Sequence, residues 1–452
     1  MKTGIRSPFG ILLLVASGLS AQSFDLGLDS AASYSQTAVT SASATQSLSL
    51  GLMLPLGRNA RIVSRTAASV SYSNTAGSSS LSYPGSLSDI DIPELSISFA
   101  GPVREQELDF LSIALGRLPY IDSTAYLFAY RIDGMILGAT WPLGTIRTVL
   151  GYTGFMPSSA PIIPSTADSS FGSGYFAPPR AVSSFSFRTP RVLGHEVYLA
   201  FTTQADMREK SQLIPEYETV FDSLSGGSAS SGYLSTGFTG SPVAGLAWSG
   251  FGIYQVGRRL SYIEDNSSAT GYSYRYSPLR AWLFGGQARY SLNPLLSLSF
   301  RGLVASGDAD SSNASDGNTE GDATLFLPMT RASTGLVFSP LPGNLTQLEV
   351  GLSFKPFPAE RIGLLSVQLS SSTFVFAKNA VGPVSEAGIL PASPAGLLGF
   401  EQDFNISVRL LSDTTLTTSL GAFMPVAGVY DQGYVDASPY QYLVRVGLSL
   451  AL

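Results

Sequence analysis

The stretch 440–452 reads YQYLVRVGLSLAL, and its side chains alternate in character with a period of two. Every even position is apolar or aromatic, whereas the odd positions include Gln441, Arg445 and Ser449, with Leu443 as the exception. Successive side chains of a β-strand point to opposite faces of the sheet. The stretch is therefore predicted to form a strand with one apolar face and one largely polar face.

The same alternation recurs upstream at 295–306, 345–355 and 400–410. A soluble β-sandwich also alternates, but only 13% of the 452 residues are charged, about half the usual share for a soluble protein. Beyond the first residues, no apolar run approaches the roughly 18 to 20 residues that a membrane helix needs. These observations predict an all-β fold, a transmembrane antiparallel β-barrel whose strands face lipid on one side and a polar lumen on the other.

The connections between the expected strands alternate in length, as they do in outer-membrane barrels. Short connections rich in Pro, Gly or Asn fall near 55–59, 101–106, 142–144, 190–193, 240–244, 291–294, 356–360 and 411–414. Longer polar ones fall near 35–44, 74–91, 119–131, 155–180, 207–229, 263–275, 307–344, 378–398 and 426–439. This pattern predicts about 18 strands. Because 324–341 is either a hairpin within a loop or two true strands, 16 and 20 strands stay open as alternatives.

The amino terminus has the layout of a secretory signal peptide. Lys2 and Arg6 precede an apolar run at 11–16, and small residues follow near Ala21. We expect residues 1–21 to be the signal peptide and 22–452 the barrel, with cleavage after Gly18 as the alternative. The chain contains no cysteine, which excludes a disulfide framework in the exported protein. The expected location is the cell outer membrane, with its lipid as a partner.

Residues at every second position of a strand point to the same face, and we call this property strand parity. If the apolar set of each strand faces lipid, parity predicts which charged side chains line the lumen. The inward-facing charged residues are Arg65, Arg147, Arg188, Arg289, Arg301, Lys355, Arg409 and Arg445, together with Glu196, Glu349, Glu401 and Asp403. Basic residues therefore predominate in the wall, although the chain as a whole has a net charge of −6. Such arginines either guide an anionic solute, because guanidinium groups match carboxylates and phosphates, or pair with the inward carboxylates and stiffen the wall.

Several short motifs resemble those of the alginate-export porin family. They are Leu115-Gly116-Arg117 followed by Asp122, Asp133-Gly134, Gly151-Tyr152-Thr153-Gly154, Ala305-Ser306-Gly307-Asp308, the segment 399–404 and Phe423-Met424-Pro425. The resemblance covers roughly 107–154 and 279–452. It implies a monomeric barrel of eighteen strands with a basic lumen for anionic sugar polymers or similar solutes. The chain departs from this pattern in lacking a dense arginine cluster and in ending at Leu452 rather than at an aromatic residue, so export of alginate itself is not expected.

Catalytic and metal-binding signals are weak. The single histidine, His195, shares the parity of Val197, which predicts a position on the outer face; no serine motif links it to a lipase-like site. The acidic segment 308–322 half-resembles a calcium loop but lacks the closing glutamate, so a solvated loop is expected. We find no phosphate-binding glycine loop and no nucleic-acid-binding patch. The sequence predicts neither an enzyme nor a cofactor.

Two functions follow from these expectations. The first is a channel in which small polar or anionic solutes, acidic saccharides among them, diffuse through a partly basic lumen. The alternative is a structural or adhesive surface barrel whose long outer loops carry the function. Eighteen strands enclose more space than side chains alone can fill, which favours the channel.

Overall fold

The computed structural model describes most of the chain downstream of the expected signal peptide. The described residues are 23–36, 40–56, 59–75, 78–82, 91–101, 110–157, 176–207, 218–219, 229–269, 271–311, 321–357, 366–386, 389–390, 393, 396–411, 413–426, 428–430 and 440–451. The predicted signal peptide, 1–21, lies outside them. None of these residues forms a helix long and apolar enough to cross a membrane.

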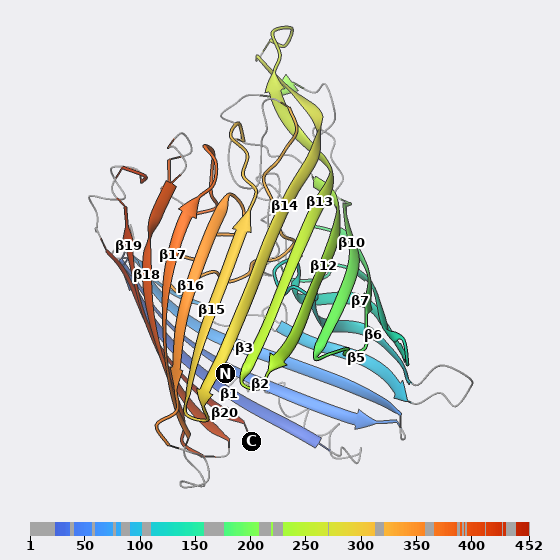
Figure 1. The fold of residues 1–452 in the computed structure, drawn as a ribbon, viewed down its shortest axis with the longest axis vertical. Coiled ribbons are helices and arrows are strands. Elements are labelled where there is room, and N and C mark those ends of the chain that lie inside the picture. Colours follow the sequence, from blue (N-terminus) through green and yellow to red (C-terminus); the bar gives the residue numbers. More distant parts are fainter. Residues whose placement is uncertain are drawn as a thin grey trace, which may run out of the picture.

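The described elements are all β-strands joined by turns and loops (Figure 1). They are β1 (Ser23–Gln36), β2 (Thr40–Pro55), β3 (Ala60–Thr75), β4 (Ser78–Ser82), β5 (Asp91–Gly101), β6 (Phe110–Ile121), β7 (Ala129–Trp141), β8 (Gly144–Tyr152), β9 (Arg180–Arg188), β10 (His195–Asp206), β11 (Glu218–Thr219), β12 (Ala229–Val243), β13 (Leu246–Glu264), β14 (Tyr272–Asn293), β15 (Leu296–Ala305), β16 (Leu345–Phe354), β17 (Ser366–Lys378), β18 (Gly396–Arg409), β19 (Thr414–Pro425) and β20 (Gln441–Ala451).

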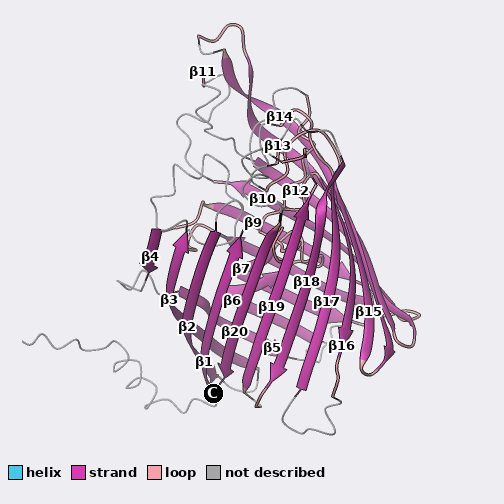
Figure 2. Ribbon diagram, turned by 90° about the vertical axis from the view of Figure 1, so that its left-hand side faces the viewer, coloured by secondary structure: helices cyan, strands magenta, loops and turns pink. Residues whose placement is uncertain are grey.

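Eighteen of these strands form one closed antiparallel barrel, which confirms the predicted fold and strand number. Each strand pairs with its neighbour in the chain, except that β4 and β11 are short additions to β3 and β14. The barrel closes where β1 pairs with β20, from Gly27 opposite Ala451 to Gln36 opposite Tyr442 (Figure 2). Within the described residues, each of the eighteen strands therefore pairs with a strand on either side, which is what a barrel in lipid requires.

Side-chain exposure follows the predicted alternation. On β16, Val350 is 55% exposed, whereas its neighbour Glu349 is 9% exposed. On β15, Phe300 is 51% exposed, and it lies directly opposite Val350. The exposed apolar side chains therefore form the outer face of the barrel, and the polar set faces the lumen.

The two ends of the barrel differ, as the connection lengths predicted. One end carries the short turns, such as the one between β12 and β13, where Gly245 adopts the left-handed backbone (φ 82°) that favours glycine. The other end carries the long loops, and the β13–β14 hairpin extends farthest beyond it (Figure 1). We call these the short-turn end and the long-loop end. The connection predicted at 35–44 is shorter than expected, because β1 and β2 pair from Gln36 and Thr40 onward.

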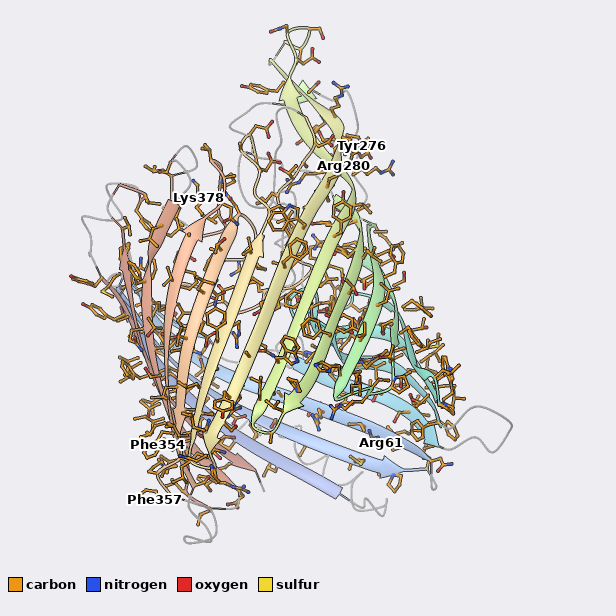
Figure 3. The ribbon with its side chains drawn as sticks, in the orientation of Figure 1. Arg61, Tyr276, Arg280, Phe354, Phe357 and Lys378 are labelled. Carbon is orange, nitrogen blue, oxygen red and sulfur yellow. The ribbon has the colours of Figure 1, made fainter. Side chains whose placement is uncertain are left out.

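Aromatic side chains mark the outer face near the short-turn end. Phe354 and Phe357 are 39% and 45% exposed there (Figure 3), and Trp248 and Tyr290 occupy the corresponding outer positions on β13 and β14. Aromatic side chains gather at both membrane–water interfaces of transmembrane barrels. Their position places the lower boundary of the lipid-facing band at this end.

The interior contains two apolar clusters, both built around the connection between β15 and β16. Phe326 and Met329 of this connection pack with residues of β6 to β9 and β12 to β15. Phe338, farther along it, stacks on Phe423 of β19 at a ring distance of 4.4 Å and contacts Phe376 of β17. The segment 324–341 is thus a loop folded into the barrel, and the count of eighteen strands holds.

Candidate solute-binding site in the barrel lumen

The connection between β6 and β7 forms a compact loop whose conformation depends on Asp122. The Asp122 carboxylate accepts hydrogen bonds from the backbone amides of Thr124 (2.8 Å), Leu127 (3.2 Å) and Phe128 (2.9 Å), and from the Thr124 hydroxyl (2.6 Å). Burial raises the pKa of this carboxyl above its usual value, and the hydrogen bonds from Phe128 and Thr124 counteract the shift. The loop presents Tyr126, whose ring stacks on Phe251 of β13 at 5.3 Å.

The loop between β15 and β16, which we call the inner loop, is described over 321–344 and is anchored to the wall at both ends. At one end the Leu327 amide donates to the Gln255 side chain (3.1 Å), and the Tyr233 hydroxyl donates to the Leu327 carbonyl (3.0 Å). At the other end the Gln347 amide group donates to the Thr334 carbonyl (2.7 Å). The amides of Met329 and Thr330 also donate to the carbonyl of Leu127, which joins the inner loop to the β6–β7 loop.

Glu401 is the central anchor of the inner loop. Its buried carboxylate accepts hydrogen bonds from three consecutive backbone amides, those of Leu336 (2.7 Å), Val337 (2.9 Å) and Phe338 (2.8 Å). A carboxylate that accepts several amide hydrogen bonds forms a strong, directional contact. Parity predicts Glu401 as a lumen residue; in the structure it is buried, and its carboxylate holds the inner loop.

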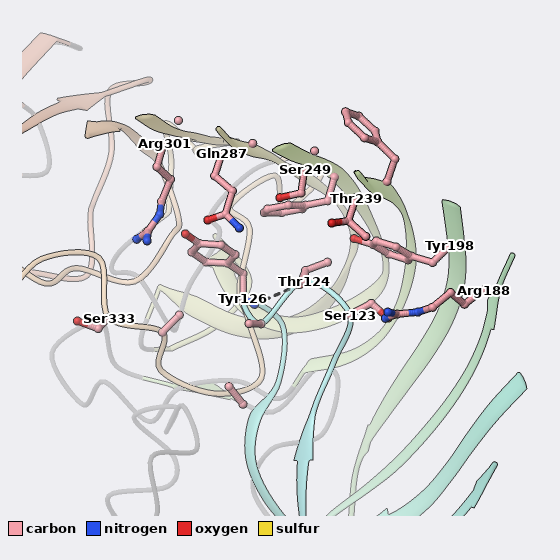
Figure 4. Close-up of a pocket in the computed structure, with 18 of the residues that line it drawn as sticks. Ser123, Thr124, Tyr126, Arg188, Tyr198, Thr239, Ser249, Gln287, Arg301 and Ser333 are labelled. Atoms are coloured by element: carbon pink, nitrogen blue, oxygen red, sulfur yellow. Dashed lines mark hydrogen bonds between the residues drawn. The ribbon is translucent and has the colours of Figure 1, made fainter. Parts of the chain in front are cut away.

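A cavity of about 600 Å³ lies between these two loops and the wall. Arg188 and Arg301 lie at opposite ends of its wall side, and Gln287, Ser249 and Thr239 lie between them (Figure 4). The opposite side is formed by residues of the two loops, which include Thr124, Tyr126 and Ser333 (Figure 4). Arg331 of the inner loop also lines the cavity. The cavity therefore combines cationic, hydroxyl, amide and aromatic groups.

Two further cavities of about 400 Å³ each continue along the same wall toward the short-turn end. The first shares Gln287 and Arg301 with the large cavity and adds Arg289. The second shares Arg289 with the first and reaches Lys355. Arg301, Arg289 and Lys355 thus follow one another along a polar path, which we call the basic row.

The lining of the three cavities is positively charged. Among the described residues, this lining contains Arg188, Arg289, Arg301, Arg331 and Lys355 and a single carboxylate, that of Glu349. Arg301 pairs with Glu349 at 3.2 Å, and its side chain remains 40% exposed. In the described part of the chain, no carboxylate lies within ion-pair distance of Arg289 or Lys355, and Arg289 donates to the Ser297 hydroxyl (3.1 Å).

The remaining predicted lumen residues lie away from these cavities or against their margins. Arg188, at the end of the large cavity, pairs with Glu196 at 2.8 Å. Arg65 approaches Glu94 at 3.7 Å, and the Arg147 guanidinium lies 5.1 Å from the ring centre of Tyr120. Arg409 and Arg445 lie at inward register positions on β18 and β20. Asp403 is buried beside the inner loop.

Three polar residues of the large cavity that the prediction missed, Gln287, Tyr126 and Arg331, show what parity can and cannot identify. Gln287 shares the parity of Arg289 on β14, so the alternation could have identified it. Tyr126 and Arg331 belong to loops, for which parity has no meaning. Close to Arg331, burial raises the pKa of Glu386, and the positive charge of Arg331 opposes that shift.

Arg117 of the Leu-Gly-Arg motif lies on the outer face of the barrel. Its guanidinium makes a bidentate ion pair with Asp133, at 2.7 and 2.9 Å, and also donates to the Phe155 carbonyl (2.8 Å). Both side chains of the pair are only 16% exposed. The motif therefore joins β6 and β7 near the long-loop end rather than lining the lumen.

His195 lies on the outer face near the short-turn end, as its parity predicted. Its Nε2 accepts a hydrogen bond from the indole N–H of Trp248 (3.0 Å), and its Nδ1 lies 2.9 Å from the Leu193 carbonyl oxygen. Both ring nitrogens thus have structural partners. The described residues contain no group of three acidic or histidine side chains able to hold a metal, and most of the acidic segment 308–322 lies outside them.

No protein-family model matches this sequence, and a comparison with curated proteins finds no match. Solved structures do match in fold. OccK5 (OpdH) of Pseudomonas aeruginosa is 9% identical, with a TM-score of 0.50 over 96% of this chain and 99% of that one. OccK2 (OpdF) of the same organism is 11% identical, with a TM-score of 0.52 over 95% and 97%. OccAB2 of Acinetobacter baumannii is 8% identical, with a TM-score of 0.52 over 96% and 98%.

These matches show that the chain has the eighteen-stranded fold of outer-membrane porins. The alginate-export resemblance is not among them and stays a prediction. A second structure of OccK2 was solved in complex with glucuronate, and this chain is 10% identical to it with a TM-score of 0.50 over 95% and 97%. At such identities the likeness concerns the fold alone.

Proposed function

We propose that this chain is an outer-membrane channel through which small polar or anionic solutes, acidic saccharides among them, pass by diffusion. The observation that carries the proposal is the basic row, formed by Arg301, Arg289 and Lys355, along adjoining cavities inside a closed barrel of eighteen strands. The two inward loops border the large cavity and so narrow the lumen at this level.

The chemistry of the large cavity suits a solute that combines a carboxylate with hydroxyl groups. Arg188 and Arg301 offer guanidinium forks for the carboxylate, and the side chains between them offer amide and hydroxyl groups. Glucuronate, the compound bound to OccK2, has this combination. The alginate-export resemblance points to the same class, acidic sugars.

Several further assignments accompany this proposal. Residues 1–21 direct export as a signal peptide, and residues 22–452 form the barrel. The protein works as a monomer surrounded by outer-membrane lipid, and it needs neither cofactor nor metal. We assign it no enzymatic activity and no nucleic-acid partner.

The alternative function, a structural or adhesive barrel, has one observation in its favour. The β13–β14 hairpin extends beyond the long-loop end (Figure 1), and β11 pairs with β14 there (Figure 2). However, the described part of the inner loop, 321–344, folds into the lumen, where it borders the large cavity. This arrangement favours a function of the lumen over one of the loops.

Single-channel recording in a planar bilayer tests the proposal. We expect discrete conductance steps and a weak anion preference, measured as the reversal potential in a salt gradient. Fixed charges in a narrow passage act strongly on ions, whereas exposed charges are screened beyond about 10 Å at 0.1 M salt. Replacing Arg289, Arg301 and Lys355 together with Gln should abolish the anion preference. Adding glucuronate should reduce the current through the wild type more than through this triple variant.

Arg131→Gln is the matched control, because Arg131 shares the outer-face parity of Asp133 and pairs with the neighbouring Tyr130 instead of lining a cavity. Its reversal potential should equal that of the wild type. A barrel without conductance would support the structural or adhesive alternative. A cation-selective pore that the triple variant leaves unchanged would show that the arginines stiffen the wall and do not guide solutes.

A further inference from the structure

We propose that the outer face of β13 and β14 binds the phosphate of an outer-leaflet glycolipid through Arg258 and Arg280. The inference rests on the proposed function in one respect, namely that the barrel spans an outer membrane. It concerns the lipid-facing surface and is independent of the lumen and its solutes.

The strand register places the two arginines on the same outer patch. β13 and β14 pair without interruption, with Tyr254 opposite Trp282, Val256 opposite Arg280 and Arg258 opposite Pro278. Tyr254 and Trp282 are exposed on the outer face, at 46% and 36%. Because parity is conserved along a regular strand, Arg258 and Arg280 project from the same face as these aromatic residues.

The two arginines lie at the depth of lipid headgroups. On β13 the outer positions are uncharged from Trp248 to Val256, and Arg258 is the next; on β14 they are uncharged from Tyr290 to Trp282, and Arg280 is the next. Each arginine thus lies roughly ten residues from the aromatic residue near the short-turn end. At about 3.3 Å per residue and a tilt of about 40°, this separation corresponds to roughly 25 Å, the height of the apolar band of a membrane barrel.

The local contacts orient both guanidinium groups toward the surface. The Arg258 guanidinium carbon lies 4.7 Å from the ring centre of Tyr276. Arg280 forms an ion pair with Asp322 at 3.0 Å, but its side chain remains 64% exposed (Figure 3). Both arginines are therefore positioned yet accessible. Arg117, the outer-face arginine of β6, is in contrast engaged by Asp133 and the Phe155 carbonyl and is largely buried.

The chemistry of the patch selects a phosphorylated lipid. Two guanidinium groups can bind phosphate oxygens with paired hydrogen bonds. Directly below them, the exposed side chains of Val256, Trp282 and Phe284 offer an apolar surface for acyl chains. A free phosphate ion would use only the first of these features, whereas a glycolipid with a phosphorylated headgroup would use both.

The test measures binding of diphosphoryl lipid A to the purified, detergent-solubilised full chain, for example by native mass spectrometry. Each basic residue near a membrane surface contributes about 1 kcal/mol to the binding of anionic lipid. The double variant Arg258→Gln, Arg280→Gln should therefore bind about thirtyfold more weakly, which corresponds to about 2 kcal/mol. Arg275→Gln, which removes a charge from the opposite face of the same hairpin, should stay within about twofold of the wild type.

Three outcomes would overturn the inference. The first is equal binding by the double variant and the wild type, and the second is equal binding of lipid A and the same lipid stripped of its phosphates. The third is competition by inorganic phosphate at the concentration of the lipid, because the site would then be one for the free ion. Heat-dependent gel mobility shows whether each variant is a folded barrel.

Conductance of the same preparations separates this inference from the proposed function. A double variant that conducts like the wild type but has lost lipid binding supports the lipid site. A wild-type protein that conducts but does not bind phosphorylated lipid overturns the lipid site and leaves the channel standing. A barrel that binds lipid A in the expected way but does not conduct supports the lipid site and refutes the channel.

Discussion

Replacing Glu401 with Gln should release the inner loop from the wall of the barrel. The carboxylate accepts hydrogen bonds from three backbone amides through both of its oxygens: Oε1 accepts those of Leu336 and Val337, and Oε2 accepts that of Phe338. Glutamine keeps one carbonyl oxygen and replaces the other with an NH₂ group, which cannot accept. At least one buried amide therefore loses its acceptor and faces a donor.

The magnitude follows from these contacts. A hydrogen bond to a charged group contributes about 1.5 to 3 kcal/mol, and a buried donor left without an acceptor costs about 1 to 3 kcal/mol. A change of about 3 kcal/mol in favour of the released loop is therefore expected, which increases the released fraction by about two orders of magnitude. The Gln347 contact with Thr334 remains in this variant, so release should start at 336–338.

Two assays report on the released loop. Trypsin should cut after Arg331 faster in the variant, and peptide mass spectrometry identifies the cut. Single-channel records should show frequent transitions to a larger conductance. Glu94→Gln is the control, because Glu94 is a wall carboxylate near Arg65 and its described contacts lie on β3 and β5. If Glu401→Gln matches the wild type in both assays, the three hydrogen bonds do not hold the loop.

Three further predictions concern the face to which strand side chains point, the conformation of the β6–β7 loop, and the pH dependence of the turn at Asp265. Val350→Arg and Phe300→Arg should impair barrel assembly by about 2 to 4 kcal/mol, whereas Ser353→Arg and Ser299→Arg should not; equal losses of heat-stable gel mobility in both pairs would contradict the assigned faces. Asp122→Ala leaves four donors without their acceptor, so the amides of Leu127 and Phe128 should lose about 2 to 4 kcal/mol of protection from hydrogen exchange; unchanged protection would contradict the anchoring role. The hydroxyl and amide of Ser267 hold the pKa of Asp265 below its usual value. Stabilisation of this turn should therefore be complete above the usual carboxyl pKa of about 4 and be lost as the pH falls through the lowered value, which amide chemical shifts of Ser267 and Ser268 would report.

Strand positions and facing were predictable because lipid imposes the alternation residue by residue. Val350 and Phe300 belong to the apolar set that parity assigns to the lipid side, and Glu349 belongs to the inward set; their exposed fractions agree with this assignment. Arg301, also assigned inward, lines the cavities and pairs with Glu349. The strand number followed from the alternation of short and long connections. The one ambiguous segment, 324–341, has apolar pairs that resemble strand sequence, because it packs into an apolar cluster inside the barrel.

The roles of the inward residues were less predictable. Parity states which side of the wall a residue faces, but not whether a loop lies against it. Glu401 therefore looked like a lumen carboxylate, whereas it binds the backbone of a segment more than sixty positions earlier in the chain. Arg331 and Tyr126 reach the cavity because two loops fold inward, and no local pattern in a polar loop predicts that direction.

The pairing of β1 with β20 has a consequence for how the protein acquires its shape. The partners in this seam, such as Gly27 and Ala451, lie in the first and last strands of the barrel, so their contact has the longest sequence separation among its strand pairings. Pairings between distant segments form late, since the entropy of closing a long loop opposes them. Until β20 is in place, β1 presents an unpaired edge that can template aggregation. The last strand of the barrel along the chain, β20, is thus the one that converts an open sheet into a closed barrel, and shortening it would affect assembly far more than its share of the sequence suggests.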